Sequence, residues 1–305
     1  MWPNPIRSGL GASPTSTPMK AGCIGFTFLG QGQYTGDMEW SPDPFLYPPY
    51  LRTRIKRRRG IGVGPRYVPW LKVRDVPSRG TSVISHGILS GRAHHLLSEL
   101  EATYFYLLER RSSTVEIREQ WPILDIDRTL ELCAKFGVRQ GVRNGYPEPF
   151  TVDFLITERV DGKLRYRAAS IKSPEDAQDP GIRRRLAVEH AWCEERGIPW
   201  ALVNTQRFNK TMLENLRFLR GWFRHRYVPD PSLVDRFASH FESLYAPNRP
   251  LCEILIVLSK ALRQPTPTVE DAFRYCAWSG RIQPSLAHPL SLDAPVVLES
   301  SVVHA

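Results

Sequence analysis

The sequence predicts a mixed α/β protein, in which a sheet is flanked by helices, followed by a small C-terminal domain of the winged-helix kind. The first observation is that segments with a 3.6-residue apolar period alternate with short strand-like runs between residues 92 and 223. Their order is helix, three strands, helix, strand, helix. The second observation is that three further helix-like segments and a weakly alternating stretch with prolines follow Pro229. These patterns divide the chain into a flexible N-terminal arm (1–50), a basic segment (51–91), a main α/β domain (92–228) and the C-terminal domain (229–305).

Each element of the main domain has a local signal. A helix is expected at 92–111, where leucines and aromatic residues recur on one face, and strands are expected at 115–121, 150–157 and 164–172. Pro122 is expected to end the first strand, and Asp161-Gly162 predicts a tight turn between the last two. A helix at 179–196 begins with an Asp-Pro pair and stops at a glycine, and a strand at 200–204 and a helix at 209–223 follow. Residues 136–149, rich in Gly, Arg and Pro, are expected to form a loop.

The C-terminal domain is expected to contain helices at 231–245, 251–262 and 268–279 and a hairpin within 281–298. Three helices followed by a hairpin suggest a winged-helix domain. Residues 1–50 are rich in Pro, Gly, Ser and Thr and show no period of either kind, which predicts a flexible arm.

Composition places the chain among ordinary globular proteins. Its 305 residues are 42% hydrophobic and 24% charged, which excludes a wholly disordered chain and a membrane bundle. The longest apolar stretch, 252–258, is interrupted by Glu253 and is far shorter than the roughly 18 residues of a spanning helix. Five scattered cysteines without a C-x-x-C pair predict a reducing compartment and no zinc site. Since the N-terminus also lacks the pattern of a secretory signal, we expect a cytoplasmic protein without a membrane partner.

The formal net charge of +10 is concentrated in one segment. Residues 51–80 hold ten lysines and arginines against one aspartate. Such a run attracts polyanions without reading their sequence, and the glycines and aromatic residues threaded through it allow a strand to approach closely. We therefore expect nucleic-acid contacts from Arg54, Lys56, Arg57, Arg58, Arg59 and Arg66. The alternative interpretation is a solvated tail or a localisation signal.

One glutamate of the first helix lies where an apolar side chain is expected. On a helical projection Glu101 falls within the stripe that contains Leu97 and Leu100, whereas Glu99 and Glu109 fall outside it. A core-facing carboxylate is costly unless it is paired or binds a metal, so Glu101 requires a partner. Alternatively, it lies at the rim of the stripe and extends into solvent.

Asp153 interrupts an apolar strand in the same way. Ser170 and Lys172 share a face of the following strand, and across a hairpin they can converge on Asp153. Two carboxylates with a further oxygen suit Mg²⁺ or Mn²⁺, and a nearby lysine can orient or help to deprotonate an attacking water. A phosphodiester is the natural substrate of such a site. The alternative is an Asp–Lys ion pair that only closes the sheet edge. Glu189, on the next helix, lies either near this site or in a pair with a neighbouring arginine.

These residues and the text around them resemble a known family. A helical glutamate, a strand aspartate and a lysine on the next strand are typical of the restriction-endonuclease-like fold. The segments "YVPWLKVRDVPSRG", "GRAHHLLSELE", "VEIREQWPIL", "TVDFL", "ASIKSPEDAQD" and "EERGIPWALV" are similar to the TnsA family, the endonuclease subunits of heteromeric transposases. The resemblance covers residues from about 55 to 225 and implies a restriction-endonuclease-like catalytic domain at 92–228.

The resemblance also implies roles for particular residues. It gives Glu101, Asp153 and Lys172 as catalytic residues, with Glu189 as a further acidic group. The metal ligands would be Glu101, Asp153, the Ser170 hydroxyl and the Ile171 carbonyl. The chain departs from the family at Ser170, where a TnsA protein carries glutamine. A serine hydroxyl is shorter, so the Ile171 carbonyl is expected to supply more of the ligation.

The implied activity is Mg²⁺-dependent cutting of the non-transferred DNA strand at transposon ends, with Mn²⁺ as a substitute. The implied partners are double-stranded DNA, a TnsB-type DDE transposase and a TnsC-type ATPase, in the nucleoid of a bacterial cytoplasm. Two alternatives remain open at this point. One is an inactive assembly factor that bridges the transposase and the ATPase, and the other is a stand-alone restriction-like nuclease.

Overall fold

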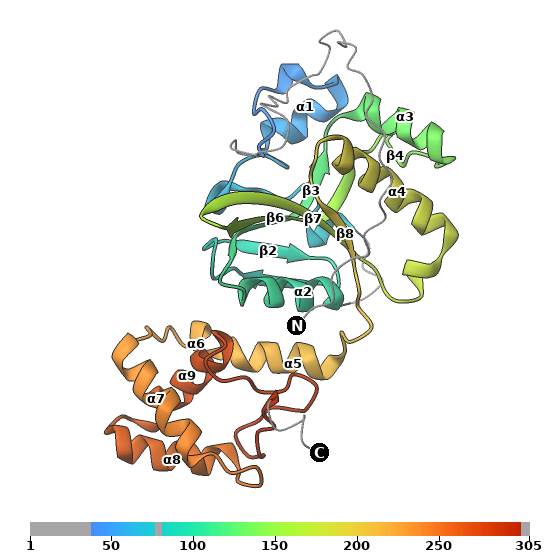
Figure 1. Cartoon of the computed structure of the whole chain (residues 1–305). Coiled ribbons are helices and arrows are strands. Elements are labelled where there is room, and N and C mark those ends of the chain that lie inside the picture. The colour runs from blue at the N-terminus through green and yellow to red at the C-terminus, as the bar shows by residue number, and fades with distance from the viewer. Residues whose placement is uncertain (1–37, 77–80, 300–305) are drawn as a thin grey trace.

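The computed structural model describes residues 38–76 and 81–299. Its centre is a four-stranded sheet in the order β3-β6-β7-β8, with β3 at Thr114–Ile123, β6 at Phe150–Val160, β7 at Lys163–Ile171 and β8 at Trp200–Val203 (Figure 1). The first three strands pair antiparallel and β8 pairs parallel to β7. The mixed sheet with helical flanks that the sequence predicts is therefore present.

Helices cover both faces of this sheet (Figure 1). The small strands are β1 (Val83–His86), β2 (Ala93–Leu96), β4 (Val142–Arg143) and β5 (Tyr146–Pro147). The helices are α1 (Pro49–Lys56), α2 (Glu99–Glu109), α3 (Ile126–Phe136), α4 (Pro180–Glu195), α5 (Lys210–Leu219), α6 (Gly221–Arg224), α7 (Pro231–Leu244), α8 (Leu251–Leu262) and α9 (Thr266–Trp278). One buried core joins the sheet to α2, α5 and α7–α9, and a second joins its other face to α1, α3 and α4.

Local signals set several of these boundaries as expected. Asp161 and Gly162 have φ of 51° and 74°, which gives the tight β6–β7 turn. The Asp179 side chain accepts a hydrogen bond from the Ile182 amide at 2.8 Å and caps α4, whose first residue is Pro180. The predicted β6–β7 hairpin and α4 are confirmed.

The predicted helix at 92–111 is wrong in its first third. Residues 93–96 form β2, which pairs antiparallel with β1 and was missed. The helix begins at Glu99 because the Ser98 hydroxyl accepts a hydrogen bond from the Glu101 amide at 3.1 Å. The Ser-x-x-Glu spacing of a capping box was the signal for this start.

The first long strand and the segment after it also differ from expectation. β3 continues through Pro122, where the strand was expected to end. β3 is the edge strand of the sheet, so a residue without an amide hydrogen is tolerated there. The helix α3 was not predicted, although its last residue is followed by Gly137 with φ of 63°, an ordinary helix stop.

In β3 and in its neighbour β6, the side chains exchange faces of the sheet at the level of Gln120. Residues two apart in a regular strand share a face. Ile117 nevertheless packs in the core beside α2, whereas Trp121, of the same parity, packs in the core on the opposite side. Gln120 has φ of 48°, a left-handed conformation that reverses the alternation. The neighbouring strand β6 shows the same reversal: Phe154 lies in the first core, whereas Val152, two residues away, lies in the second.

The N-terminal part of the described chain is folded. Met38 and Trp40 are buried in the second core, and the Trp40 indole donates to the Pro122 carbonyl at 2.8 Å. The expected flexible arm therefore does not extend over residues 38–50, and residues 1–37 lie outside the described part. Tyr67 and Trp70, two of the aromatic residues in the basic segment that were expected to allow a nucleic-acid strand to approach, are buried too. Core formation rather than stacking explains these aromatic residues.

The C-terminal part contains the three predicted helices, α7, α8 and α9. The winged-helix architecture is not confirmed, because no strand is formed between Trp278 and the last described residue, Glu299. Two isolated bridges are formed there instead, one from Pro284 to Leu298 and one from Pro250 to Pro295. The helices share a core with α2 and the sheet, and the buried Glu109 and Arg220 side chains form an ion pair at 2.9 Å between α2 and the end of α5.

Two smaller findings complete the fold. The four cysteines in the described part are free thiols. No described helix is both long and apolar enough to cross a membrane.

Candidate active site

A cluster of charged residues lies where the pairing of β6 with β7 stops. The pairing runs from the hairpin turn to Phe154 and Ala169. One residue further along, the Asp153 carboxylate accepts hydrogen bonds from the Ile171 amide at 2.6 Å and from Lys172 Nζ at 3.1 Å. The aspartate thus takes the place of a strand partner, and this local opening of the sheet brings a carboxylate and an ammonium together as the sequence predicts.

Lys172 is held on one side of this opening. Its Nζ also donates to the Ile171 carbonyl at 2.8 Å. Burial alone lowers the pKa of an ammonium, but the negative charges of Asp153 and Glu189 outweigh it and raise the pKa of Lys172. The lysine is therefore a fixed cation at neutral pH.

Glu101 reaches the same region from the start of α2. Its carboxylate accepts hydrogen bonds from the Leu97 amide at 2.9 Å and from the Ser98 hydroxyl at 3.3 Å. The side chain does not extend into solvent, since the residue is only 7% exposed. Burial, followed by repulsion from Asp153, raises the pKa of Glu101 to about 8. This repulsion indicates that the two carboxylates lie near each other.

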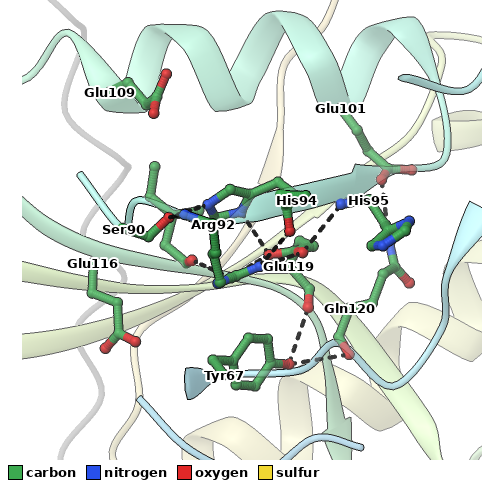
Figure 2. Close-up of polar contacts among 12 residues, drawn as sticks. Tyr67, Ser90, Arg92, His94, His95, Glu101, Glu109, Glu116, Glu119 and Gln120 are labelled. Carbon is green, nitrogen blue, oxygen red and sulfur yellow. Dashed lines mark hydrogen bonds and ion pairs between the residues drawn. The ribbon is translucent and has the colours of Figure 1, made fainter. Parts of the chain in front are cut away.

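Gln120 is a part of the site that the sequence did not reveal. The β3–β6 register pairs Glu119 with Phe154 and Trp121 with Val152, which places Gln120 opposite Asp153. Its Nε2 donates to Glu101 Oε2 at 3.2 Å, as Figure 2 shows. The available signal was a run of three polar residues, "REQ", directly before the apolar end of the strand.

The backbone of Gln120 is fixed in turn. Its carbonyl accepts a hydrogen bond from the Trp70 amide at 3.2 Å and a longer one from the Tyr67 hydroxyl at 3.4 Å. These bonds hold the left-handed turn that directs the side chain toward Glu101. Through Trp70 and Tyr67, the basic segment thus holds Gln120 in the position from which it contacts Glu101.

Glu119 anchors the strand next to Gln120 (Figure 2). It is fully buried and accepts hydrogen bonds from Arg92 at 2.6 and 2.8 Å and from His94 Nδ1 at 2.7 Å. Burial alone raises a carboxyl pKa, but His94 and Arg92 outweigh it and lower the pKa of Glu119 to about 2. Ser90 contacts the other ring nitrogen of His94 at 2.7 Å. Because these side chains are buried and the carboxylate is neutralised by an arginine, we interpret the Ser-His-Glu chain as structural support for the β1–β2 hairpin.

Ser170 and Glu189 form a second buried pair beside the cluster. The Ser170 hydroxyl donates to Glu189 Oε2 at 2.7 Å. Burial, followed by the negative charge of Asp153, raises the pKa of Glu189 to about 7. Glu189 thus lies near the site and is not paired with an arginine of residues 183–185. Ser170 contacts Glu189 rather than Asp153.

The carboxylates of this cluster are compatible with a divalent cation, although they offer few ligand atoms. Glu101, Asp153 and Glu189 are carboxylates in a buried region, and burial, followed by repulsion from Asp153, raises the pKa of Glu101 and Glu189. A cation relieves such repulsion. However, no group of three or more Asp, Glu, His or Cys side chains in residues 38–76 and 81–299 is arranged to hold a metal. Any metal site here therefore requires main-chain oxygen or water besides the carboxylates.

The six basic residues expected to bind nucleic acid fall into two groups. Arg54 pairs with Glu148, and Arg59 pairs with Asp75 at 2.6 Å, so both guanidinium groups are partly buried and neutralised. The other four side chains are exposed: Lys56, Arg57, Arg58 and Arg66. The structure thus leaves a smaller free positive surface than the sequence alone indicates.

Part of the chain is similar to proteins of a known family. Residues 111–205 match the family model described as TnsA-like endonuclease N terminal. This span contains Asp153, Ser170, Lys172 and Glu189, whereas Glu101 precedes it. The chain is also 36% identical over 169 residues to the Transposon Tn7 transposition protein TnsA of Escherichia coli, which is 55% of this chain and 61% of that relative. These two matches show that the chain is similar to TnsA proteins, that its residues 111–205 resemble the TnsA-like endonuclease N-terminal region, and that it matches 61% of the relative's length.

Proposed function

We propose that this chain is the metal-dependent DNA endonuclease subunit of a heteromeric transposase, and that it cuts the non-transferred strand at transposon ends. The main support is the cluster of Glu101, Asp153 and Lys172 at the opening between β6 and β7. This cluster overlaps a region matched to a TnsA-like endonuclease. The proposed partners are double-stranded DNA, a TnsB-type transposase that cuts and joins the other strand, and a TnsC-type ATPase.

Mg²⁺, with Mn²⁺ as a substitute, is the proposed cofactor. Glu101, Asp153 and the Ile171 carbonyl are the groups that would hold it, and the Ser170 hydroxyl, which donates its hydrogen to Glu189, keeps oxygen lone pairs that could join them. When bound, such a cation lowers the pKa of water and stabilises negative charge on a phosphodiester. The raised pKa of Glu101 supports this assignment, because a carboxylate that resists ionisation without a cation gains most from one.

The chain's own residues have distinct proposed roles. Lys172 keeps its proton at neutral pH and orients the Asp153 carboxylate through the 3.1 Å contact. The same ammonium places a positive charge beside the phosphate that is to be cut. Glu189, with a pKa of about 7, can hold or release a proton near neutral pH. We assign it a positioning role through Ser170.

The exposed cations of the basic segment supply the proposed DNA contacts. Lys56, Arg57, Arg58 and Arg66 are free to neutralise phosphates, whereas Arg54 and Arg59 contribute through the structure they hold. Exposed lysines and arginines increase affinity for any DNA sequence and make it salt-dependent. Recognition of the transposon end is therefore assigned to the partner transposase.

Strand-specific mapping of breaks at transposon ends, with the TnsB-type partner and Mg²⁺ present, tests this function. Asp153→Ala is expected to abolish cutting of the non-transferred strand while joining of the other strand continues, so cointegrates replace simple insertions. Asp293→Ala, an exposed aspartate far along the chain, is the matched control and should cut normally. Continued simple insertion by Asp153→Ala would refute the enzyme assignment and favour an assembly factor.

A further inference from the structure

A cavity of about 460 Å³ lies between α1 and the β4–β5 hairpin, apart from the carboxylate cluster. Its walls come from two segments that are distant in the sequence: residues 50–59 with Asp75, and residues 143–148. None of Glu101, Asp153, Lys172 and Glu189 lines it. A cavity of this size is within the usual range for small-molecule sites and can hold a group the size of one nucleotide.

The cavity is positively charged. Four arginines line it against two carboxylates, Asp75 and Glu148. Two of the arginines are held by these carboxylates, as described above. Arg57 makes no side-chain ion pair within the described residues, and Arg143 comes no closer than 4.0 Å to Glu148, with its side chain 49% exposed. Two guanidinium groups, one on each wall, are therefore available to an anion.

An exposed aromatic surface lies next to these charges. The rings of Tyr50 and Tyr146 are stacked, with centroids 4.7 Å apart and planes 11° apart. Tyr146 is 53% exposed, so part of its ring remains open to solvent. The hairpin is fixed by a two-residue turn at Asn144 and Gly145, with φ of 53° and 83°. Tyr146 thus lies on β5, directly after a defined turn.

Charge and stacking together specify one ligand chemistry. A phosphate requires only cations, and a duplex hides the faces of its bases in the stack. An exposed ring beside free guanidinium groups is the combination by which proteins bind single-stranded nucleic acid, because every base offers a face for stacking. The pocket therefore suits an unpaired nucleotide better than a duplex backbone.

We propose that the pocket between α1 and the β4–β5 hairpin binds a single-stranded DNA segment, with a phosphate between Arg57 and Arg143 and a base against Tyr146. This inference rests on the proposed action on DNA and extends it, because a strand freed near a cut end becomes a ligand. It also explains why Arg54 and Arg59 are paired internally: their carboxylate partners hold the pocket walls in place.

The test is DNA binding by the full-length protein in EDTA, where no cutting occurs. Fluorescence anisotropy compares a labelled oligothymidine of about ten nucleotides with a blunt duplex of equal length. Tyr146→Ala should weaken single-strand binding about 5- to 150-fold, the range of one lost base stack, and leave duplex binding unchanged. Tyr146→Phe keeps the ring and should bind as the wild type does.

The charged half of the pocket is tested by salt. Arg57→Ala combined with Arg143→Ala should reduce the slope of log affinity against log salt for the single strand by about 1.4, the value for two lost phosphate contacts. Arg165→Ala, an exposed arginine on the β6–β7 hairpin, is the matched control and should change little.

The outcomes separate this inference from the proposed nuclease function. Unchanged single-strand affinity in Tyr146→Ala, or equal loss for single strand and duplex, would overturn the inference. A protein that binds single strands through Tyr146 but never cuts transposon ends would overturn only the nuclease assignment.

Discussion

Gln120 provides the sharpest prediction, because one hydrogen bond joins it to the proposed metal ligand Glu101. Replacing Gln120 by methionine keeps the approximate side-chain volume and removes the Nε2 donor. Glu101 then keeps only its bonds from Leu97 and Ser98. A hydrogen bond to a charged group contributes about 1.5–3 kcal/mol, and the length of 3.2 Å places this one at the lower end.

The expected consequence is a tenfold weaker metal site, since about 1.4 kcal/mol corresponds to a factor of ten. Mn²⁺ affinity, measured by electron paramagnetic resonance on the complete protein, should fall by about this factor in Gln120→Met. Cutting should fall in parallel and recover at higher metal concentration. Gln140→Met is the matched control, because Gln140 is also a buried amide but bonds to the Glu148 carbonyl.

A second variant separates positioning from general destabilisation. Gln120→Gly removes the same donor but relieves a left-handed backbone, which costs a residue with a side chain about 1–2 kcal/mol. The two variants should therefore differ in stability to denaturant and yet bind Mn²⁺ equally weakly. Mn²⁺ affinity that follows stability across the two variants, or a Gln120→Met protein with wild-type affinity, would refute this reasoning.

Because the folded-state pKa values of Glu101 and Glu189 lie above the usual 4.5, the folded metal-free protein holds more protons than the unfolded chain. Its melting temperature in EDTA should therefore fall as pH rises from 6 to 8.5. Added Mg²⁺ should raise the melting temperature more at pH 8 than at pH 6. A melting temperature that rises over this range would contradict the assignment. Glu109→Gln should cost about 3–5 kcal/mol of unfolding free energy, because it leaves the buried Arg220 guanidinium without its counter-charge. Urea denaturation of this variant and of the Glu109→Gln/Arg220→Met double variant tests that coupling, and a loss below 1 kcal/mol would show that solvent reaches the pair. Ser170→Ala should raise the pKa of Glu189 further, seen as a shift of the acid limb of the cutting profile to higher pH, whereas an unshifted profile would mean that Glu189 does not act on the site.

Much of the fold followed from short-range signals. The Asp161-Gly162 turn predicted the β6–β7 hairpin, and the Asp-Pro start predicted α4. The strand pattern also predicted that Lys172 comes close to Asp153, and the structure has this contact. Such signals act within a few residues, so the sequence displays them directly.

Other sequence predictions failed because contacts between residues far apart in the sequence determine the local structure there. The helix at 92–111 loses its first residues to β2 because β1 supplies a partner strand for them. Pro122 does not end β3, since a residue without an amide hydrogen is tolerated in an edge strand. Trp70 and Tyr67 lie in a core that the described N-terminal residues complete. Of these outcomes, only the start of the helix at Glu99 had a local signal, the Ser-x-x-Glu spacing.

By itself, the sequence determined the types of residue in the site, the order of the elements around it and the excess of positive charge. The tertiary structure alone decided that Ser170 contacts Glu189, that Gln120 contacts Glu101, and that two arginines of the basic segment are neutralised. The physical reason is that the pKa of a buried group and the availability of a cation depend on partners within a few ångströms in space. Those partners lie from 16 to 94 residues away along the chain.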